Sequence, residues 1–219
     1  MHKIVQNLVN IKKEINFNLS NQKNHKIPKI IAVSKTFSMD KILPLIEYGH
    51  LDFGENKVQE AIKKWSEIKL GNNNIKLHLI GGLQTNKVKL AVKLFDFIHS
   101  VDSEKLAKKI SDEQQKQKKK VRIFIQVNIG NEDQKFGVDK LSLSKLYSYC
   151  KTLNLEVMGL MCIPPLNESS EIFFKEMNEL SKKLNLKELS MGMSSDYLNA
   201  IKNSATYVRI GSNIFGERN

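Results

Sequence analysis

The feature of this sequence that most constrains its fold is a regular alternation of short apolar segments with longer amphipathic ones. Eight segments have the length and apolar composition of buried strands, and helix-length stretches separate them. The predicted strands are residues 29–34, 51–53, 75–80, 96–101, 121–129, 155–161, 187–191 and 205–210. Helical spacing of apolar residues is clearest in residues 39–48, 86–95 and 171–184. Because β and α units alternate strictly, the chain is predicted to be an α/β protein with a parallel sheet.

Eight β/α units in 219 residues favour a closed (β/α)8 barrel of the TIM type. We expect one domain that spans residues 1–219, and the alternative is an open parallel sheet with one strand misassigned. Only nine residues follow the eighth strand, too few for an outer helix, and no C-terminal β domain is expected. An extra N-terminal helix is predicted because four apolar residues share one helical face: Ile4, Leu8, Ile11 and Ile15. This helix is expected to cover the barrel wall beside the eighth strand.

Composition disfavours several classes of protein. With 41 % hydrophobic and 26 % charged residues the chain resembles an ordinary globular protein, and no apolar stretch is long enough to span a bilayer. No secretory leader is recognisable, so the expected location is the cytoplasm. Cys150 and Cys162 have no Cys-x-x-Cys spacing and no nearby histidine pair, so we expect buried thiols. The formal charge of +12 attracts anions, but the lysines are scattered without interleaved aromatic residues, which disfavours a specific nucleic-acid site.

The predicted first strand is apolar until it ends in a lysine. Side chains alternate along a strand, so Ile31, Val33 and Lys35 share one face. The working groups of a (β/α)8 barrel lie at the C-terminal ends of its strands. If Lys35 points into the barrel mouth, the two apolar residues form a floor beneath its amine, and partial desolvation favours the neutral, nucleophilic form. The alternative is a lysine whose head group reaches solvent or pairs with Glu55.

The loops after the last two predicted strands are suited to binding phosphate, as these loops are in many such barrels. After the seventh strand, Ser194 and Ser195 offer hydroxyl groups at the start of a helical pattern, and Gly192 permits close approach of the backbone. After the eighth strand, Gly211 and Ser212 offer backbone N–H groups that could form a small nest. Helix capping by the first two serines is the alternative, although it does not explain a glycine in both loops.

Arg209 lies in the predicted eighth strand. Together with Tyr207 it would point into the barrel if Val208 and Ile210 face the helices. A buried guanidinium is costly without a partner. It would therefore either pair with an acid such as Glu188 or face a ring nitrogen of a ligand and hold that nitrogen unprotonated.

Two histidines, His78 and His99, lie in the predicted third and fourth strands. We expect hydrogen-bonded groups of the core or rim here, because no carboxylate–histidine cluster accompanies them. No metal site is predicted.

Eight motifs follow one another along nearly the whole chain: AVSKT, FGENKVQE, HLIGGLQTNK, HSVDS, KFGV, GLMCIPP, LSMGMSSDY and VRIGSNIFGER. Together they resemble the pyridoxal 5′-phosphate (PLP) homeostasis proteins, whose barrel is related to the N-terminal domain of alanine racemases. The resemblance implies a fold-type III PLP-binding barrel.

The resemblance also implies a set of cofactor-binding residues: Lys35, Asn56, Met193, Ser194, Arg209, Gly211 and Ser212. In that set Lys35 holds PLP as a Schiff base, Ser194 with the neighbouring backbone holds the phosphate, and Arg209 faces the pyridine nitrogen. Asn56 has two compatible roles, orienting the cofactor and capping the helix that follows. Lys135, after the fifth strand, is either a solvated loop lysine or a second amine that accepts the aldehyde during exchange.

Two functions from different classes fit this resemblance. One is a monomeric, non-catalytic carrier that acts in PLP homeostasis and passes the cofactor to PLP-dependent apo-enzymes. The other is a stand-alone fold-type III enzyme such as an amino-acid racemase. Alanine racemases add a C-terminal β domain and a second base, usually tyrosine, whereas no tyrosine follows Tyr207 here. An arginine at the pyridine nitrogen also weakens the cofactor as an electron sink. We therefore expect a carrier, and a basic nucleic-acid binder is a third hypothesis that depends on charge alone.

Overall fold

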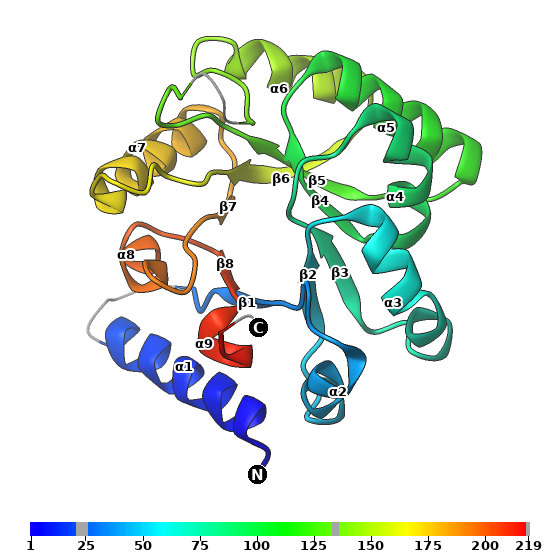
Figure 1. The fold of residues 1–219 in the computed structure, drawn as a ribbon. Helices are drawn as coiled ribbons and strands as arrows, with labels where there is room; N and C mark the ends of the chain where they lie inside the picture. Colours follow the sequence, from blue (N-terminus) through cyan, green and yellow to red (C-terminus); the bar gives the residue numbers. More distant parts are fainter. Residues whose placement is uncertain (21–25, 133–135, 218–219) are drawn as a thin grey trace.

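The computed structural model describes residues 1–20, 26–132 and 136–217, and within them eight parallel strands form a closed barrel (Figure 1). The strands are β1 Lys29–Val33, β2 Asp52–Glu55, β3 Lys76–Leu79, β4 Phe97–Val101, β5 Arg122–Gln126, β6 Glu156–Met161, β7 Glu188–Ser190 and β8 Tyr207–Ile210. Each strand pairs with the next in the sequence, and β8 closes the barrel by pairing with β1. Every predicted strand overlaps an observed one. The predicted (β/α)8 barrel is confirmed, and the open-sheet alternative is wrong.

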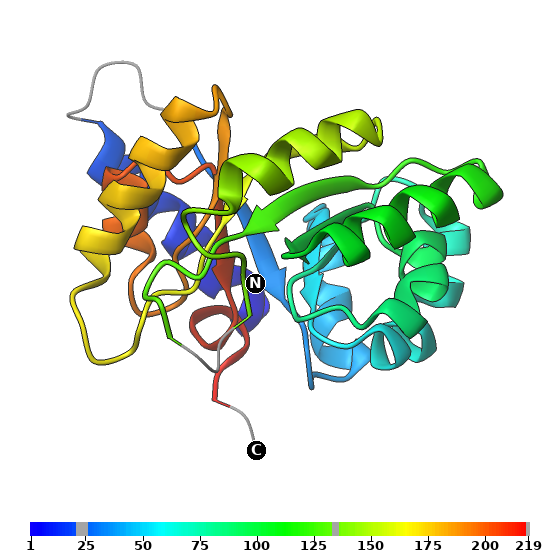
Figure 2. The same cartoon turned by 90° about the horizontal axis from the view of Figure 1, so that it is seen from above.

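Helices pack around the outside of the barrel (Figures 1 and 2). They are α1 Lys3–Leu19, α2 Met39–Glu47, α3 Val58–Gly71, the 3-10 helix η1 Thr85–Lys87, α4 Val88–Leu94, α5 Glu104–Gln117, α6 Leu143–Thr152, α7 Ser170–Lys183, α8 Tyr197–Lys202 and α9 Ser212–Phe215. The three segments with the clearest helical spacing correspond to α2, α4 and α7.

The N-terminal helix α1 completes the outer layer. It packs against α2, α8 and α9, next to the short α9 that follows β8 (Figure 1). The amide of Asn7 donates to the carbonyl of Ile214 in α9 at 2.9 Å, and the hydroxyl of Tyr197 in α8 donates to Glu14. The predicted apolar face of α1 is buried. The expectation that this helix covers the wall beside the last strand is confirmed.

Alternation along the strands divides the apolar residues into two cores. The larger core lies between the sheet and the helices and includes Val208 and Ile210, as predicted. The smaller core fills the barrel and consists of Ile31, Phe97, Phe124, Met161 and Tyr207. Because these side chains fill the interior, a ligand at the mouth of the barrel would bind above them, at the ends of the strands.

Both cysteines are buried and free, as expected. Burial raises the pKa of the Cys162 thiol to about 12, so it is unreactive as a nucleophile at neutral pH. In the described part of the chain no group of histidine, cysteine, aspartate or glutamate residues is arranged to hold a metal ion. None of the described helices is both long and apolar enough to cross a membrane.

Candidate functional site

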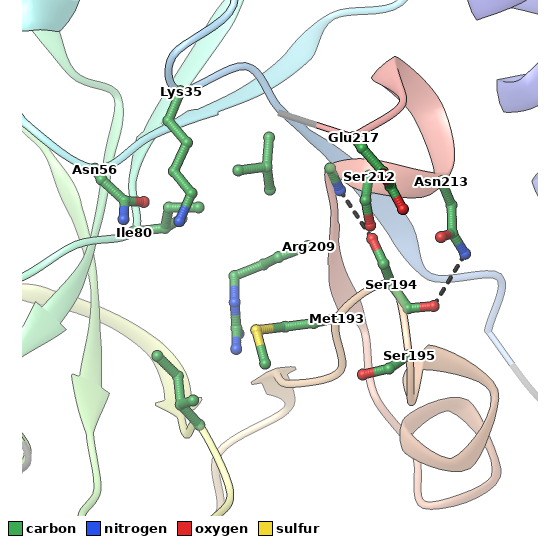
Figure 3. Close-up of a pocket in the computed structure, with 13 residues that line it drawn as sticks. Lys35, Asn56, Ile80, Met193, Ser194, Ser195, Arg209, Ser212, Asn213 and Glu217 are labelled. Carbon is green, nitrogen blue, oxygen red and sulfur yellow. Dashed lines mark hydrogen bonds between the residues drawn. The ribbon is translucent and has the colours of Figure 1, made fainter. Parts of the chain in front are cut away.

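A cavity of about 560 Å³ lies at the C-terminal ends of the strands (Figure 3). It is lined by every residue of the predicted set: Lys35, Asn56, Met193, Ser194, Arg209, Gly211 and Ser212. These residues come from the ends of β1, β2, β7 and β8, which only a closed barrel brings together. The fold therefore assembles one site from separate segments of the sequence.

Lys35 follows β1 at the mouth of the barrel. Val33 and Lys35 both line the cavity, as the alternation along the strand predicts. Thr36 has a φ of 67°, in the left-handed region, so the chain turns immediately after the lysine. The amine stands beside Asn56 and Ile80 in Figure 3. A primary amine is thus placed above a partly apolar floor.

The backbone before Lys35 is held from the helix side of the sheet by Glu55. The carboxylate Oε1 of Glu55 accepts hydrogen bonds from the Ser34 hydroxyl at 2.8 Å and from the Trp65 indole at 2.9 Å. Lys64 joins the end of β1 to the end of β2, since its Nζ donates to Glu55 Oε1 at 2.9 Å and to the Ser34 carbonyl at 2.8 Å. Glu55 thus lies on the opposite face of the sheet from the cavity, which disfavours the predicted alternative of a pair with Lys35.

The two candidate phosphate-binding loops are bonded to each other (Figure 3). The N–H of Gly211 donates to the hydroxyl of Ser194 at 3.2 Å, and the amide of Asn213 donates to the Ser194 carbonyl at 2.9 Å. The alternative of helix capping by Ser194 is not favoured, because α8 begins only at Tyr197, after Asp196. The predicted helix start at the serines is therefore wrong by two residues, because Asp196 accepts from the Met193 N–H and closes a turn first.

Gly192 and Gly211 have different roles in these loops. Gly192 has a φ of 89°, and a Cβ there would lie 2.5 Å from the Cβ of Ala200 in α8. At Gly211 the φ is −115°, and a Cβ would meet Val33 at an ordinary 3.4 Å. Only the first position requires glycine for its conformation.

The guanidinium of Arg209 lies inside the barrel and lines the cavity. Its Nη1 donates to the carbonyl and the hydroxyl of Ser190 at 2.7 and 2.8 Å, and its Nη2 donates to the Cys162 carbonyl at 2.8 Å. Burial lowers the pKa of Arg209 from its usual value. Glu188, the predicted alternative partner, accepts a hydrogen bond from Lys26 at 3.2 Å. Among the described residues, Arg209 uses three of its five N–H donors, so two are left for a ligand.

The remaining candidates are Asn56 and Lys135. Asn56 lines the cavity, and the N-cap of α3 is Lys57, so the capping role predicted for Asn56 is not observed. Lys135 lies outside the described residues. The cavity wall also includes Ile80, Ile163, Asn213 and Glu217, which were not predicted. Only Asn213 had a signal in the sequence, its position directly after Ser212, since the two isoleucines look like ordinary strand residues.

Comparisons with known proteins assign this chain to a family. Residues 12–219 match the family model described as alanine racemase, N-terminal domain. A pyridoxal phosphate homeostasis protein from Aquifex aeolicus (strain VF5) is 40 % identical over 200 residues, which cover 87 % of each chain. This chain belongs to the pyridoxal phosphate homeostasis protein family. The human pyridoxal phosphate homeostasis protein is 36 % identical over 211 residues, covering 87 % of this chain and 77 % of the human one.

Solved structures support the same assignment. PipY of Synechococcus elongatus PCC7942, a structure with PLP bound, has a TM-score of 0.87 and 31 % identity, and the match covers 97 % of this chain and all of PipY. An alanine racemase from Clostridium difficile 630 has a TM-score of 0.70 at 15 % identity, covering 95 % of this chain and 57 % of the racemase. The second likeness shows a shared fold only. The predicted resemblance to the PLP homeostasis family is confirmed.

Proposed function

We propose that this chain binds PLP as a Schiff base on Lys35 and acts as a non-catalytic carrier in PLP homeostasis. The observation that carries the proposal is the convergence of three matching groups in one cavity: the Lys35 amine, the Arg209 guanidinium and the bonded loops around Ser194 and Gly211. PLP has an aldehyde, a ring nitrogen and a phosphate. Each of these three groups thus has a partner of suitable chemistry in the cavity.

The cavity fits a ligand of this size and charge. Its volume of about 560 Å³ is within the range typical of small-molecule sites. Lys35 provides the amine that condenses with an aldehyde, with loss of water. The loop containing Ser194 and the N–H groups of Gly211 and Ser212 would hold the phosphate. When bound, PLP supplies an electrophilic imine that stabilises negative charge on an attached amino acid.

The protonation state expected for the ring nitrogen beside Arg209 supports a carrier role. Arg209 is a donor that stays protonated at neutral pH, so it accepts no proton and offers only N–H groups to the ring. A nitrogen held unprotonated makes the cofactor a weaker electron sink. The names of the relatives agree with a homeostasis role. We therefore infer that the chain stores PLP and passes it to apo-enzymes.

The test of binding is spectroscopic and chemical. Purified protein incubated with PLP should become yellow, and borohydride should fix the ligand covalently to the peptide that contains Lys35. Lys35→Ala should abolish both signals. Lys57→Ala is the matched control, because Lys57 lies at the same rim and pairs with Glu60 on the surface. A protein that stays colourless with PLP, or a label on another lysine in the unsubstituted chain, would contradict the proposal.

The test of the carrier role uses transfer and turnover. Loaded protein should activate an apo-enzyme that depends on PLP, and it should not racemise alanine or other amino acids at enzyme-like rates. Rapid turnover would favour the enzyme hypothesis instead. Comparing Lys135→Ala with the unsubstituted chain in the transfer assay tests the proposed second amine, and unchanged loading and release would identify Lys135 as an ordinary loop lysine.

A further inference from the structure

The barrel interior contains a continuous chain of hydrogen bonds below the proposed cofactor site. The Nη1 of Arg209 donates to Ser190 Oγ at 2.8 Å, and Ser190 Oγ lies 2.9 Å from Nδ1 of His99. The Nε2 of His99 lies 2.9 Å from Nδ1 of His78, whose Nε2 lies 3.0 Å from Oδ1 of Asp52. We call these five residues the interior chain. It connects the cavity to the opposite end of the barrel.

The interior chain is enclosed by aromatic rings. His78 stacks on Phe97 with ring centroids 4.4 Å apart, and His99 stacks on Phe124 at 4.3 Å. Both imidazoles are fully buried, and this burial lowers their pKa values, so both are neutral at pH 7. Burial has the largest single effect on the carboxyl of Asp52 and opposes its ionisation, but the hydrogen bond with His78 and the nearby positive charges, Lys29 among them, together outweigh it and lower the pKa.

The residues at the two ends of the interior chain, Arg209 and Asp52, determine the direction of every hydrogen bond between them. An ionised Asp52 only accepts, so His78 must carry its proton on Nε2 and accept on Nδ1. His99 must then donate from Nε2 and accept on Nδ1, and that acceptor needs the hydroxyl proton of Ser190. The oxygen of Ser190 is left to accept from Arg209. All donors point from the guanidinium toward the carboxylate, and such aligned bonds polarise one another.

We propose that the interior chain positions the Arg209 guanidinium from the far end of the barrel, so that one of its remaining N–H donors faces the ring nitrogen of the cofactor. This inference rests on the proposed function, because PLP supplies that nitrogen. Asp52, His78 and His99 are therefore positioning residues for a ligand that they do not touch. Asp52 is the first residue of β2 and lines a second cavity, of about 380 Å³, together with Lys12, Lys29 and other residues.

The first test needs neither ligand nor substitution. Long-range proton–nitrogen NMR of the histidine side chains, in protein without PLP at pH 7, should show His78 and His99 as neutral imidazoles protonated on Nε2. A cationic His78, or an Nδ1 proton on either ring, would reverse part of the hydrogen-bond direction. That result would overturn the inference, whatever the chain binds.

The second test distinguishes the contribution of the ring nitrogen to binding from that of the rest of the ligand. Two ligands are titrated, PLP and its analogue in which a C–H replaces the pyridine nitrogen. Asp52→Leu should weaken PLP binding about tenfold and change binding of the analogue by less than about twofold, since only PLP has the acceptor that Arg209 faces. Asp52→Asn keeps an acceptor for His78 and should restore PLP affinity.

Glu188→Leu is the matched control, because Glu188 is also an acid at the first residue of its strand but bonds to Lys26 rather than to the interior chain. It should leave the ratio of the two affinities unchanged. Equal weakening of both ligands by Asp52→Leu would identify a merely structural role and overturn the inference. Failure of the unsubstituted chain to bind either ligand is a distinct result, which would contradict the proposed function itself. If Asp52→Leu does not fold, the NMR measurement on the unsubstituted chain decides.

Discussion

Glu55 is the residue on which the position of Lys35 most depends, although it does not line the cavity. It is fully buried, and the side chain of its ionic partner Lys64 is 14 % exposed. One carboxylate oxygen accepts three hydrogen bonds, which join the end of β1 to β2 and α3. A buried acid with this many partners is a structural requirement for the strand end that carries the proposed ligand-binding lysine.

Glu55→Ala should lower the free energy of unfolding by about 3 kcal/mol, because it removes the buried carboxylate that accepts from Lys64, Ser34 and Trp65. Urea denaturation measures the loss. Glu60→Ala removes the partner of the exposed Lys57, the N-cap residue of α3, and should leave the free energy of unfolding essentially unchanged. Equal effects of the two substitutions would show that Glu55 contributes no more than a surface ion pair.

His50 gives stability a defined dependence on pH. Burial lowers its pKa to about 4, from an ordinary value near 6.5 in the unfolded chain. Between these two values the unfolded chain binds a proton that the folded chain does not, so stability falls as the pH decreases. The contribution lost between pH 7 and pH 5 is about 2 kcal/mol.

His50→Gln should therefore reduce the difference in unfolding free energy between pH 7 and pH 5 by about 2 kcal/mol. Urea denaturation at both pH values measures that difference. The buried His78 and His99 have pKa shifts in the same direction and keep a residual pH dependence in the variant. An unchanged difference would show that His50 is protonated to the same extent in both states.

Among the elements, the loops after β7 and β8 act as a unit, because Ser194 and Gly211 are directly bonded. The two loops differ in whether they have space for a larger residue in place of glycine. The first loop is tightly packed on α8 at Gly192, and the second has space at Gly211. Alanine substitutions at these two glycines therefore serve as controls for each other.

Gly192→Ala should cost about 2 kcal/mol of stability and weaken PLP binding, because the new Cβ adds strain at a positive φ and displaces α8. Gly211→Ala should change stability by less than about 1 kcal/mol. Thermal unfolding and PLP titration of both variants provide the comparison. A Gly211→Ala variant as unstable as Gly192→Ala would contradict this account of the loops.

At the scale of the whole molecule, barrel closure connects the first strand to the last. Pairing of β1 with β8 makes the ends of the chain depend on each other, and α1 adds contacts with α8 and α9. We therefore propose that residues 1–219 unfold as one domain in a single cooperative transition.

The measurement compares two probes of unfolding. The fluorescence of Trp65, the only tryptophan in the sequence, reports on α3 against β2, and far-ultraviolet circular dichroism reports on all helices. Their transitions in urea should coincide. Separate midpoints would indicate that the barrel unfolds in parts and would contradict a single domain.

Much of this architecture was predictable from the sequence, because local periodicity carries it. The alternation of β and α segments predicted the barrel, and the two-residue period within strands predicted that Lys35 and Arg209 point to the mouth and interior. The glycines and serines after the last two strands predicted a pair of loops that lie together. Such patterns depend on residues close in the chain, so a single sequence contains them completely.

Other features were decided only by the tertiary structure. His78, His99 and Ser190 come from β3, β4 and β7, and they form one hydrogen-bonded chain only because closure and strand register bring those positions together. The burial of Glu55 against α3, and the need for glycine at residue 192 but not 211, likewise depend on neighbours distant in sequence. Local composition does not specify register between distant strands, which is set by packing of the whole barrel. The sequence by itself therefore determined that Lys35, Arg209 and the loops after the last two strands reach the site, and the closed barrel decided which other residues line it and what holds them there.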